Sequence, residues 1–511
     1  MSAFPQSWKS TVSHWQATNR GRDALWSHGS SEPLPGIVVD YAIIGAGIAG
    51  SSLAYQLTRP GAAGEGKTVV CLEAKDLASG ATGRNGGHVA PASFGMFPTL
   101  TTPLSAGGSG LTNDEALAVL ENELDTLNYA QEIIEKEGLA VDFWKGHKLE
   151  AKVSREGVES ARRAHKAYTT ARANSEKFRG TDSAWEFLDD PDVSQKLSRI
   201  PSALAINRGP AGSCHPHKLA TELMKLALSS TSSNFSFYSW CPVKSITRDD
   251  AEATWSLDCH GRGIVRAKVV ILCTNAHTRH LFSEDERTTG IARHITPFRG
   301  HAALITPTLP YTGRRTISHS YALEAGPYLM TTPSSGIVMG VYNATALSAG
   351  IARKKDIFEA IDDSIVLPSF EKWLSEYCEK AFGGWREEAH GEGLTRVWTG
   401  IMAGSRDHLP LIGSVPNKEG LYAAVAFHGH GMARILTCTR ALALQLLHGP
   451  SYWDERLPRS FEITEKRLQR ARQEAPEIIT KEEMEQVELV EAMGKSTLNG
   501  GLRADVVPTS V

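Results

Sequence analysis

The sequence of 511 residues lacks the features that mark secreted, membrane-spanning or nucleic-acid-binding proteins. Its seven cysteines are odd in number and form no CxxC pair, which is typical of a reducing compartment. No apolar run reaches the roughly 18 residues that a membrane span needs, and the N-terminal MSAFPQSWKS does not have the layout of a secretion signal. A net charge of -3 gives no reason to expect a polyanion partner. We therefore expect a cytoplasmic protein that binds neither nucleic acid nor membrane.

One glycine-rich stretch, VVDYAIIGAGIAG at residues 38–50, is the most informative part of the chain. Its apolar residues predict a strand, and a helical pattern follows over residues 51–57. The glycines let the backbone turn tightly, approach a pyrophosphate and bring the helix close to the strand; they are Gly45, Gly47 and Gly50. The first amides and the positive dipole end of such a helix favour a bound diphosphate.

A second predicted strand supports this interpretation. It covers residues 68–72 and ends in Glu73, whose carboxylate can accept hydrogen bonds from ribose hydroxyls. The order of strand, glycine turn, helix, strand and acidic residue predicts dinucleotide binding. The alternative is that the glycines only form a tight turn.

The chain is longer than one hydrophobic core usually supports, so we expect two interleaved domains. A buried parallel strand at 269–273 and a strand, glycine turn and helix over 420–447 return to the pattern of the first unit. Strand-like runs between 290 and 350 predict an antiparallel sheet. We assign 38–100, 201–288 and 391–450 to the cofactor-binding domain, 101–200 and 289–390 to a substrate domain, 1–37 to an N-terminal arm and 451–511 to a helical tail.

Two long helices are predicted where no chemistry is readable. Residues 112–137 repeat apolar side chains at three- and four-residue spacing, and residues 154–177 are highly charged and helix-prone. We assign both helices a structural role.

Separated motifs in the sequence resemble the D-amino-acid-oxidase-like family of FAD-dependent amine oxidoreductases, which includes glycine oxidase and sarcosine oxidase. The motifs are IIGAGIAG at 43–50, SGATGRNGGHV at 79–89, VVILCTNAHT at 269–278, and WTGIMAGSRDHLPLIG at 398–413 with AAVAFHGHGM at 423–432. The ATGRNGG segment is most similar to the branch that contains gamma-glutamylputrescine oxidoreductase. The resemblance implies an α/β (α+β) fold: a discontinuous Rossmann-like FAD-binding domain interleaved with a substrate domain on a mixed or antiparallel sheet.

The resemblance also implies which residues hold FAD. The pyrophosphate would contact Gly45, Gly47, Ile48, Ala49 and Gly50. The adenosine ribose would contact Glu73, and the adenine would contact Val243. The loop beside the isoalloxazine ring would contain Ala81, Thr82, Arg84, Asn85, Gly86, Gly87 and His88. Thr274, Asn275 and Trp398 are further expected contacts, and the pyrimidine end would face Gly429, His430, Gly431 and Met432.

The last of these assignments also has a physical argument. A reduced flavin carries negative charge near N1 and the C2 carbonyl, and a helix that opens at Gly431 would direct its positive end there. The alternative is that the GHG sequence is a simple helix entry.

The implied reaction removes a hydride from a carbon that bears an amine and leaves an imine, which water hydrolyses to a carbonyl compound and an amine or ammonia. Dioxygen or another acceptor would reoxidise the flavin. Candidate catalytic residues are His430, Tyr328, Tyr342 and Arg299, whose planar guanidinium suits a substrate carboxylate. Alternatively, Arg299 pairs internally and the tyrosines only pack. We expect no metal, because the HPH of residues 215–217 opens a helix.

Two departures from sarcosine-oxidase-like relatives affect the prediction. Residues 395–413 contain no cysteine for covalent attachment, so we expect non-covalent FAD, with attachment through His88 as the alternative. The family's two lysines near the flavin fall closest to Val338 and Ala433, which argues against a simple N-methyl amino acid substrate and against efficient use of dioxygen.

Two other functions remain open at this point. A related flavoenzyme could act on a different bond, as in 2-hydroxy acid oxidation, desaturation or ring closure. A non-catalytic FAD-binding subunit or chaperone is the second alternative. A nicotinamide dehydrogenase is disfavoured, because the segments at 79–89 and 427–432 would have no role around a nicotinamide.

Overall fold

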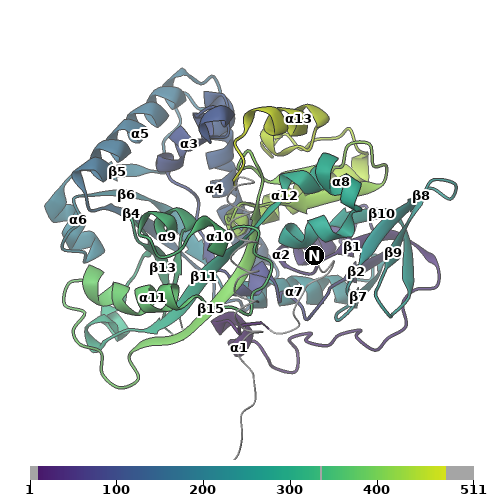
Figure 1. Ribbon diagram of the computed structural model, residues 1–511, viewed down its shortest axis with the longest axis horizontal. Helices are drawn as coiled ribbons and strands as arrows, with labels where there is room; N and C mark the ends of the chain where they lie inside the picture. Colours follow the sequence, from purple (N-terminus) through teal and green to yellow (C-terminus); the bar gives the residue numbers. More distant parts are fainter. Residues whose placement is uncertain (1–9, 334–335, 479–511) are drawn as a thin grey trace, which may run out of the picture.

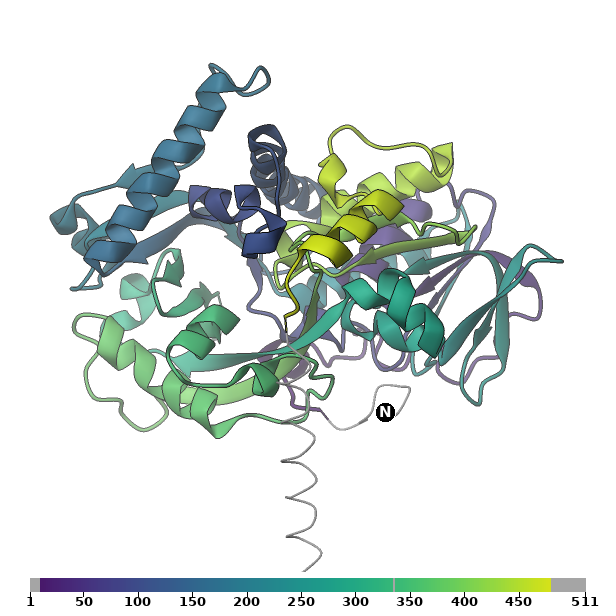
Figure 2. The same cartoon turned by 45° about the horizontal axis from the view of Figure 1, so that its top comes forward.

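The computed structural model describes residues 10–333 and 336–478, which fold around two large β-sheets (Figure 1). The two sheets lie in opposite halves of the molecule in both views (Figure 2). Each sheet is assembled from segments far apart in sequence, so the chain crosses between the halves several times.

The first sheet has eight strands, and its main path runs β16-β17-β10-β1-β2-β7. Strands β17, β10, β1, β2 and β7 are parallel to one another, whereas β16, β9 and β8 add antiparallel pairs. Their bounds are β1 Val38–Ile44, β2 Thr68–Leu72, β7 Asn234–Tyr238, β8 Ser245–Asp249, β9 Thr254–Asp258, β10 Ile264–Leu272, β16 Leu411–Ser414 and β17 Leu421–Val425. Since Ile44 is in register with both Leu72 and Leu272, the carboxyl ends of three neighbouring strands meet at one edge.

The second sheet has nine strands in the order β15-β11-β14-β13-β12-β4-β6-β3, with β5 paired to β6. It is mixed, because β12 and β4 are parallel and the other neighbours are antiparallel. Its strands are β3 His88–Val89, β4 Trp144–Lys152, β5 Glu186–Leu188, β6 Ala205–Ser213, β11 Thr296–Thr306, β12 Ser320–Leu323, β13 Pro327–Thr332, β14 Gly336–Val341 and β15 Gly393–Gly404. This architecture confirms the predicted fold class.

Helices cover both sheets. Helices α2 (Ile48–Leu57), α4 (Asn113–Lys136), α7 (Pro216–Ser229) and α12 (Ile435–His448) share one hydrophobic core beside the first sheet. Helix α11 (Pro368–Ala381) packs on the second sheet. The remaining helices are α1 His14–Thr18, α3 Phe97–Thr101, α5 Arg155–Asn174, α6 Pro191–Ser198, α8 Glu284–Thr289, α9 Asn343–Ser348, α10 Lys354–Ile357 and α13 Glu465–Glu474.

The sheet pairings differ from the predicted domain pieces. Strands β6 and β15 lie in the second sheet, although the sequence placed residues 201–288 and 391–450 in the cofactor-binding domain. Helix α4, which was placed in the substrate domain, packs against α12 and α2 in the core of the first half. The reason is that strand membership is decided by distant pairing, of β15 with β11 and of β6 with β4, which local sequence patterns do not encode.

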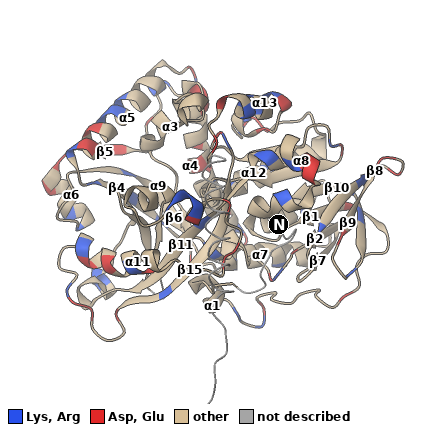
Figure 3. Cartoon of the chain, viewed as in Figure 1, with Lys and Arg blue, Asp and Glu red and all other residues tan. Residues whose placement is uncertain are grey.

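Surface charge is mixed. Lys and Arg alternate with Asp and Glu over the outer helices, as α13 illustrates (Figure 3). Within the described part of the chain, no helix combines the length and the apolar character required to traverse a bilayer.

Candidate functional site

A cavity of about 270 Å³ lies where the carboxyl edge of the first sheet meets the second sheet. Residues from β1 and β2 and residues that directly follow β10 line one part of it, and residues from β4, β13 and β15 line another. An α/β sheet binds its ligands at this edge because the strand ends and helix N-termini point there.

The predicted glycine turn forms one wall of the cavity. Gly45 has a φ of +99°, a left-handed conformation that favours glycine. A Cβ on Gly50 would lie 1.9 Å from the Gly45 carbonyl oxygen, and one on Gly47 would lie 2.9 Å from Oγ1 of Thr82. Gly50 therefore lets the backbone of α2 approach the Gly45 carbonyl, whereas a side chain at Gly47 would meet the Thr82 hydroxyl.

The N-terminus of α2 opens onto the cavity. Its N-cap residue is Gly47, which has no side chain with which to cap the helix, and Gly47, Ile48 and Ala49 all line the cavity. The Ile48 amide donates to Oγ1 of Thr82 at 2.8 Å. Gly50 does not line the cavity; it lies where the helix packs against the strand. This start of a helix has the amide groups and dipole that favour a diphosphate.

Glu73 lies at the end of β2 and also lines the cavity. Its Oε2 accepts from the Ala46 amide at 2.7 Å and its Oε1 from the Lys75 amide at 3.1 Å. Each carboxylate oxygen has a second lone pair, so the group can still accept from ribose hydroxyls. Burial raises the pKa of this carboxyl above its usual value. Three further predicted contacts line the same cavity: Val243, Thr274 and Asn275.

The loop over residues 81–88 contributes another wall. Its 3₁₀ turn spans Ala81–Arg84, and the residues of the loop that line the cavity are Ala81, Thr82, Asn85, Gly86 and His88. Gly87 does not line it; its φ of +75° makes the bend behind Gly86. A Cβ on Gly86 would lie 2.5 Å from the ring of Tyr328, so this loop is pressed against the second sheet.

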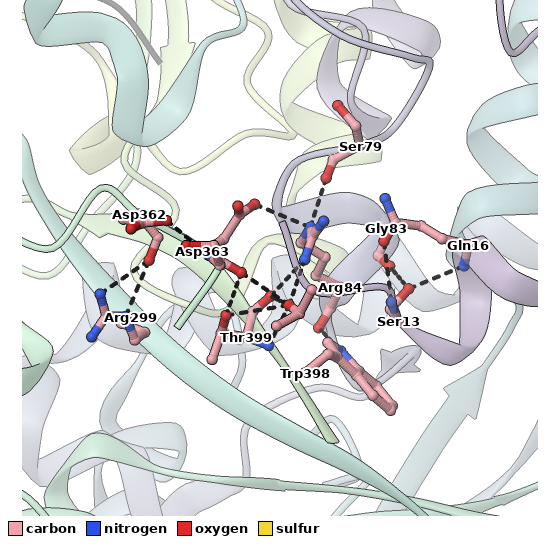
Figure 4. Close-up of polar contacts among 12 residues, drawn as sticks. Ser13, Gln16, Ser79, Gly83, Arg84, Arg299, Asp362, Asp363, Trp398 and Thr399 are labelled. Carbon is pink, nitrogen blue, oxygen red and sulfur yellow. Dashed lines mark hydrogen bonds and ion pairs between the residues drawn. The ribbon is translucent and has the colours of Figure 1, made fainter. Parts of the chain in front are cut away.

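Arg84 faces away from the cavity and anchors this loop (Figure 4). Its Nε lies 3.2 Å from Oδ2 of Asp363 and donates to the Ser79 carbonyl at 2.8 Å. Its Nη1 donates to the Thr399 carbonyl and to Oγ1 of Thr11, each at 2.9 Å. Arg84 therefore acts through the shape of the loop and not through contact with a ligand.

Trp398 has a similar supporting place. It is fully buried, does not line the cavity, and donates from Nε1 to the Arg84 carbonyl at 2.7 Å. The N-terminal arm supports the same loop: Trp15 donates from Nε1 to the Asn85 carbonyl at 2.6 Å, and Ser13 donates to the Gly83 carbonyl.

The GHG segment lines the same cavity as the glycine turn. The cavity is lined by the glycine turn at 45–49 and also by Gly429, His430, Gly431 and Met432. Two stretches far apart in sequence therefore share one site. The expectation of a helix that opens at Gly431 is corrected: Gly431–Ala433 is a 3₁₀ turn, and α12 begins at Ile435. Gly429, with a left-handed φ of +71°, precedes the turn, and Arg434, with an irregular φ of -134°, separates the turn from the helix.

The second sheet supplies an aromatic wall. Tyr328 and Tyr342 both line the cavity with ring centroids 5.0 Å apart, and His88 meets Tyr328 edge-on at 5.2 Å. Burial raises the pKa of Tyr328 to about 12 and that of Tyr342 further still. Both phenols are therefore neutral near pH 7.

Arg299 is not part of this wall. Its Nε and Nη2 donate to the Asp362 carbonyl at 3.2 and 3.0 Å, and its Nη1 donates to the Asp356 carbonyl at 3.3 Å (Figure 4). It does not line the cavity. Arg299 therefore forms its hydrogen bonds within the protein, which was the alternative interpretation. Its assignment to a substrate carboxylate is withdrawn.

Lys148 on β4 was not expected from the sequence, and it lines the cavity beside the tyrosines. Its Nζ donates to the Pro91 carbonyl at 2.6 Å and lies 3.0 Å from Oε1 of Glu150. A lysine at a core position of the strand, two residues before an acidic side chain on the same face, was the available signal. Ala433, one of the two positions matched to the family's lysines, also lines the cavity.

The HPH segment has a structural explanation. His215 is the N-cap of α7 and its Nδ1 accepts from the Lys218 amide at 3.2 Å. His217 contacts the side chain of Asn19 at 2.9 Å. Across the residues that the structure describes, no group of His, Cys, Asp or Glu side chains is placed to hold a metal ion.

The residues of the cavity fit FAD along its length. The glycine turn and the start of α2 suit the diphosphate, Glu73 suits the ribose, and the loop with His88 and the GHG turn suit the ring system. At several glycines of this cradle an added Cβ would collide with neighbouring atoms. The backbone of the cradle can therefore pass this close to its neighbours only because these residues are glycine.

Comparison with known proteins agrees with this cavity. The family model described as "FAD dependent oxidoreductase" (DAO) matches residues 40–445. No curated protein sequence matches the chain significantly.

Three solved structures illustrate the fold. Glycine oxidase from Geobacillus kaustophilus is 16% identical with a TM-score of 0.62, covering 84% of this chain and 98% of its own. L-amino acid deaminase from Proteus vulgaris is 15% identical with a TM-score of 0.60, and the match covers 86% of this chain and 99% of the deaminase chain. FAD-bound L-alpha-glycerophosphate oxidase from Mycoplasma pneumoniae is 13% identical with a TM-score of 0.54, covering 84% and 99%. At these identities the likeness shows the fold, whereas the family match covers most of the sequence. The chain therefore belongs to the DAO family of FAD-dependent oxidoreductases, with FAD as its cofactor.

Proposed function

We propose that the protein oxidises a carbon–nitrogen bond of an amine or amino acid. The bound FAD supplies a hydride acceptor. The observation that carries the proposal is the enclosure of one cavity by the nucleotide cradle, the GHG turn and the tyrosine wall, which provides for cofactor and small substrate together. The names of two structural neighbours, a glycine oxidase and an L-amino acid deaminase, support this class of substrate.

The chain's own groups orient the substrate and exclude water. Tyr328 and Tyr342 offer flat apolar faces and neutral hydroxyls, and His430 faces the same space. We propose that these three residues contact substrate. We propose that FAD is held without a covalent bond, because residues 395–413 contain no cysteine where sarcosine-oxidase-like relatives attach the flavin.

A substrate carboxylate has one suitable cation on this wall. Lys148 has three N–H donors, of which one goes to the Pro91 carbonyl and one faces Glu150. The third remains for a substrate anion, and we propose Lys148 for the role that the sequence assigned to Arg299. This assignment favours amino acids over simple amines.

A second candidate is oxidation of a carbon–oxygen bond. The glycerophosphate oxidase among the structural neighbours supports it, since the same fold is used there. Anaerobic mixing of the purified yellow protein with paired substrates separates the two: amino acids, the amines that lack their carboxyl groups, and the matching 2-hydroxy acids. Bleaching of the flavin by amino acids or amines is expected. Bleaching by hydroxy acids alone contradicts the proposal, and a flavin that no compound bleaches indicates a non-catalytic subunit.

Whether dioxygen accepts the electrons is tested on the same sample. We propose slow reoxidation by air, because the lysine that helps dioxygen in sarcosine-oxidase-like relatives falls closest to Val338 in this chain. Reoxidation after admission of air is followed at the flavin absorption band, with a soluble quinone as the alternative acceptor.

A further inference from the structure

A buried carboxylate lies directly behind His430. Glu123 lies on α4, the helix to which the sequence assigned only a structural role, and it is fully buried. Its Oε2 lies 2.9 Å from Nε2 of His430, and its Oε1 lies 2.8 Å from Nε of Arg434. The Ala92 amide donates to Oε2 at 2.6 Å. Three separate segments of the chain thus converge on one carboxylate that does not itself line the cavity.

The environment of Glu123 keeps it ionised. Burial alone would raise the pKa of this carboxyl, but His430, Arg434 and the Ala92 amide outweigh burial and hold the pKa at about 2. An ionised carboxylate can only accept hydrogen bonds. The Nε2 atom of His430 must therefore carry the proton of the bond to Glu123.

This hydrogen bond determines which ring nitrogen of His430 is available to a ligand in the cavity. A neutral imidazole has one N–H and one lone pair, so a proton on Nε2 leaves the lone pair on Nδ1. The side chain of His430 is 32% exposed and lines the cavity, whereas Glu123 is 0% exposed. One edge of the ring is thus held in the protein core, and the rest of the ring faces the cavity.

We propose that Glu123 is a positioning residue that holds His430 with Nδ1 available to accept a proton from the ammonium group of the substrate. This inference rests on the proposed oxidation of an amine. The substrate unit R₂CH–NH₃⁺ gives one proton to Nδ1 and becomes R₂CH–NH₂, from which loss of a hydride leaves R₂C=NH₂⁺. The imidazolium that forms is paired with the carboxylate of Glu123, which lowers the cost of the transfer.

Several charged or titratable groups lie near His430. Arg434 faces the far oxygen of Glu123, the imidazoles of His428 and His88 lie near His430, and Lys148 lines the same cavity. Burial lowers the pKa of His428 to about 3 and that of His88 to about 4. Both rings are therefore neutral between pH 5 and 9 and add no protonation step of their own in that range.

The test uses the visible absorption spectrum of the holoenzyme, titrated from pH 5 to pH 9 without substrate. The flavin band of the unaltered protein should show a protonation step that is absent in His430→Asn. In Glu123→Gln the step should move by about one pH unit or more toward lower pH, because the imidazolium loses its carboxylate partner. Glu123→Asp keeps the charge and should give an intermediate midpoint.

Asp407 provides a matched control. It is a buried carboxylate paired with Arg467 at 2.6 Å, and it does not line the cavity. Asp407→Asn should lower the thermal midpoint as Glu123→Gln does, yet leave the spectral step where it is. If Glu123→Gln fails to fold, Glu123→Asp and His430→Asn still decide the question.

Two results would overturn the inference: a step that survives His430→Asn, or a midpoint that no substitution at Glu123 moves. Anaerobic flavin reduction with the amine panel adds a double-mutant cycle, in which Glu123→Gln should slow reduction in the unaltered protein but not further in His430→Asn. An additive effect contradicts action through His430. A step that moves as expected while no amine reduces the flavin supports the Glu123–His430 pairing and refutes the oxidation of an amine.

Discussion

Arg84 and Asp363 form an ion pair of 3.2 Å that joins the loop beside the flavin site to a segment 279 residues further along the chain. The Arg84 side chain is 1% exposed, and its hydrogen bonds go to the Ser79 carbonyl, to the N-terminal arm and to β15. The loop is thus fixed at a point where four segments meet.

Replacement of this guanidinium should be costly. Arg84→Met should lower the free energy of unfolding by about 3 kcal/mol, because Asp363 keeps its charge without a partner. Chemical denaturation measures the change. Arg84→Met with Asp363→Asn should recover part of the loss, since no orphaned charge remains. Arg162→Met, which removes two exposed ion pairs, should change stability far less.

Gly50 should be essential for cofactor retention. A Cβ at this position would lie 1.9 Å from the Gly45 carbonyl, so Gly50→Ala must push α2 away from β1 and disturb the diphosphate site. We expect the purified variant to have lost most of its flavin, measured as the ratio of flavin to protein absorbance. Gly36→Ala meets no atom within 4 Å and should retain the cofactor. Full retention by Gly50→Ala would show that the cradle tolerates a side chain.

Asp76 should make stability depend on pH near neutrality. Burial raises the pKa of this carboxyl to about 7, and its Oδ2 has no hydrogen-bond partner within the described residues. A raised pKa means that this contribution to stability is complete below the unfolded value near 4 and is lost as the pH rises through 7. Asp76→Asn should therefore stabilise the protein at pH 8 by about 2 kcal/mol and change little at pH 4. Equal effects at both pH values would argue against a protonated Asp76.

Tyr328 should contribute through its hydroxyl. Tyr328→Phe keeps the ring that packs across Gly340 and beside Tyr342, but removes the polar group in the cavity. We expect kcat/KM to fall about tenfold, equivalent to one hydrogen bond of about 1.4 kcal/mol, with little change in thermal stability. Tyr321→Phe is the comparison, because that hydroxyl bonds to the Ser198 carbonyl and its loss should mainly reduce stability. An unchanged kcat/KM in Tyr328→Phe would assign Tyr328 to packing alone.

The sequence was most informative where local rules decide the structure. Strand 68–72 was predicted with its observed bounds, and the helix predicted over 112–137 is observed as Asn113–Lys136 with Thr112 as its N-cap. Both depend on spacing and capping, which neighbouring residues encode. The cradle glycines were predicted for the same reason, since each one's role follows from a turn between a strand and a helix.

The supporting residues were not predictable in this way. Glu123 follows Leu120 by three residues and precedes Leu127 by four, so a charged residue stands in the core-facing stripe, while Leu124 is only half-buried. That irregularity was the available signal, but its partners His430 and Arg434 lie about 300 residues away. Arg299 shows the converse. A guanidinium group suits a substrate carboxylate, yet this one donates its hydrogen bonds to two backbone carbonyl groups.

The N-terminal arm has a bearing on biosynthesis. Thr11 accepts a hydrogen bond from Arg84, donates to the Asp363 carbonyl and contacts Thr399. During translation Thr11 is added 388 residues before Thr399. This junction can therefore close only after β15 has left the ribosome, and flavin capture by the finished cleft is expected to follow that step.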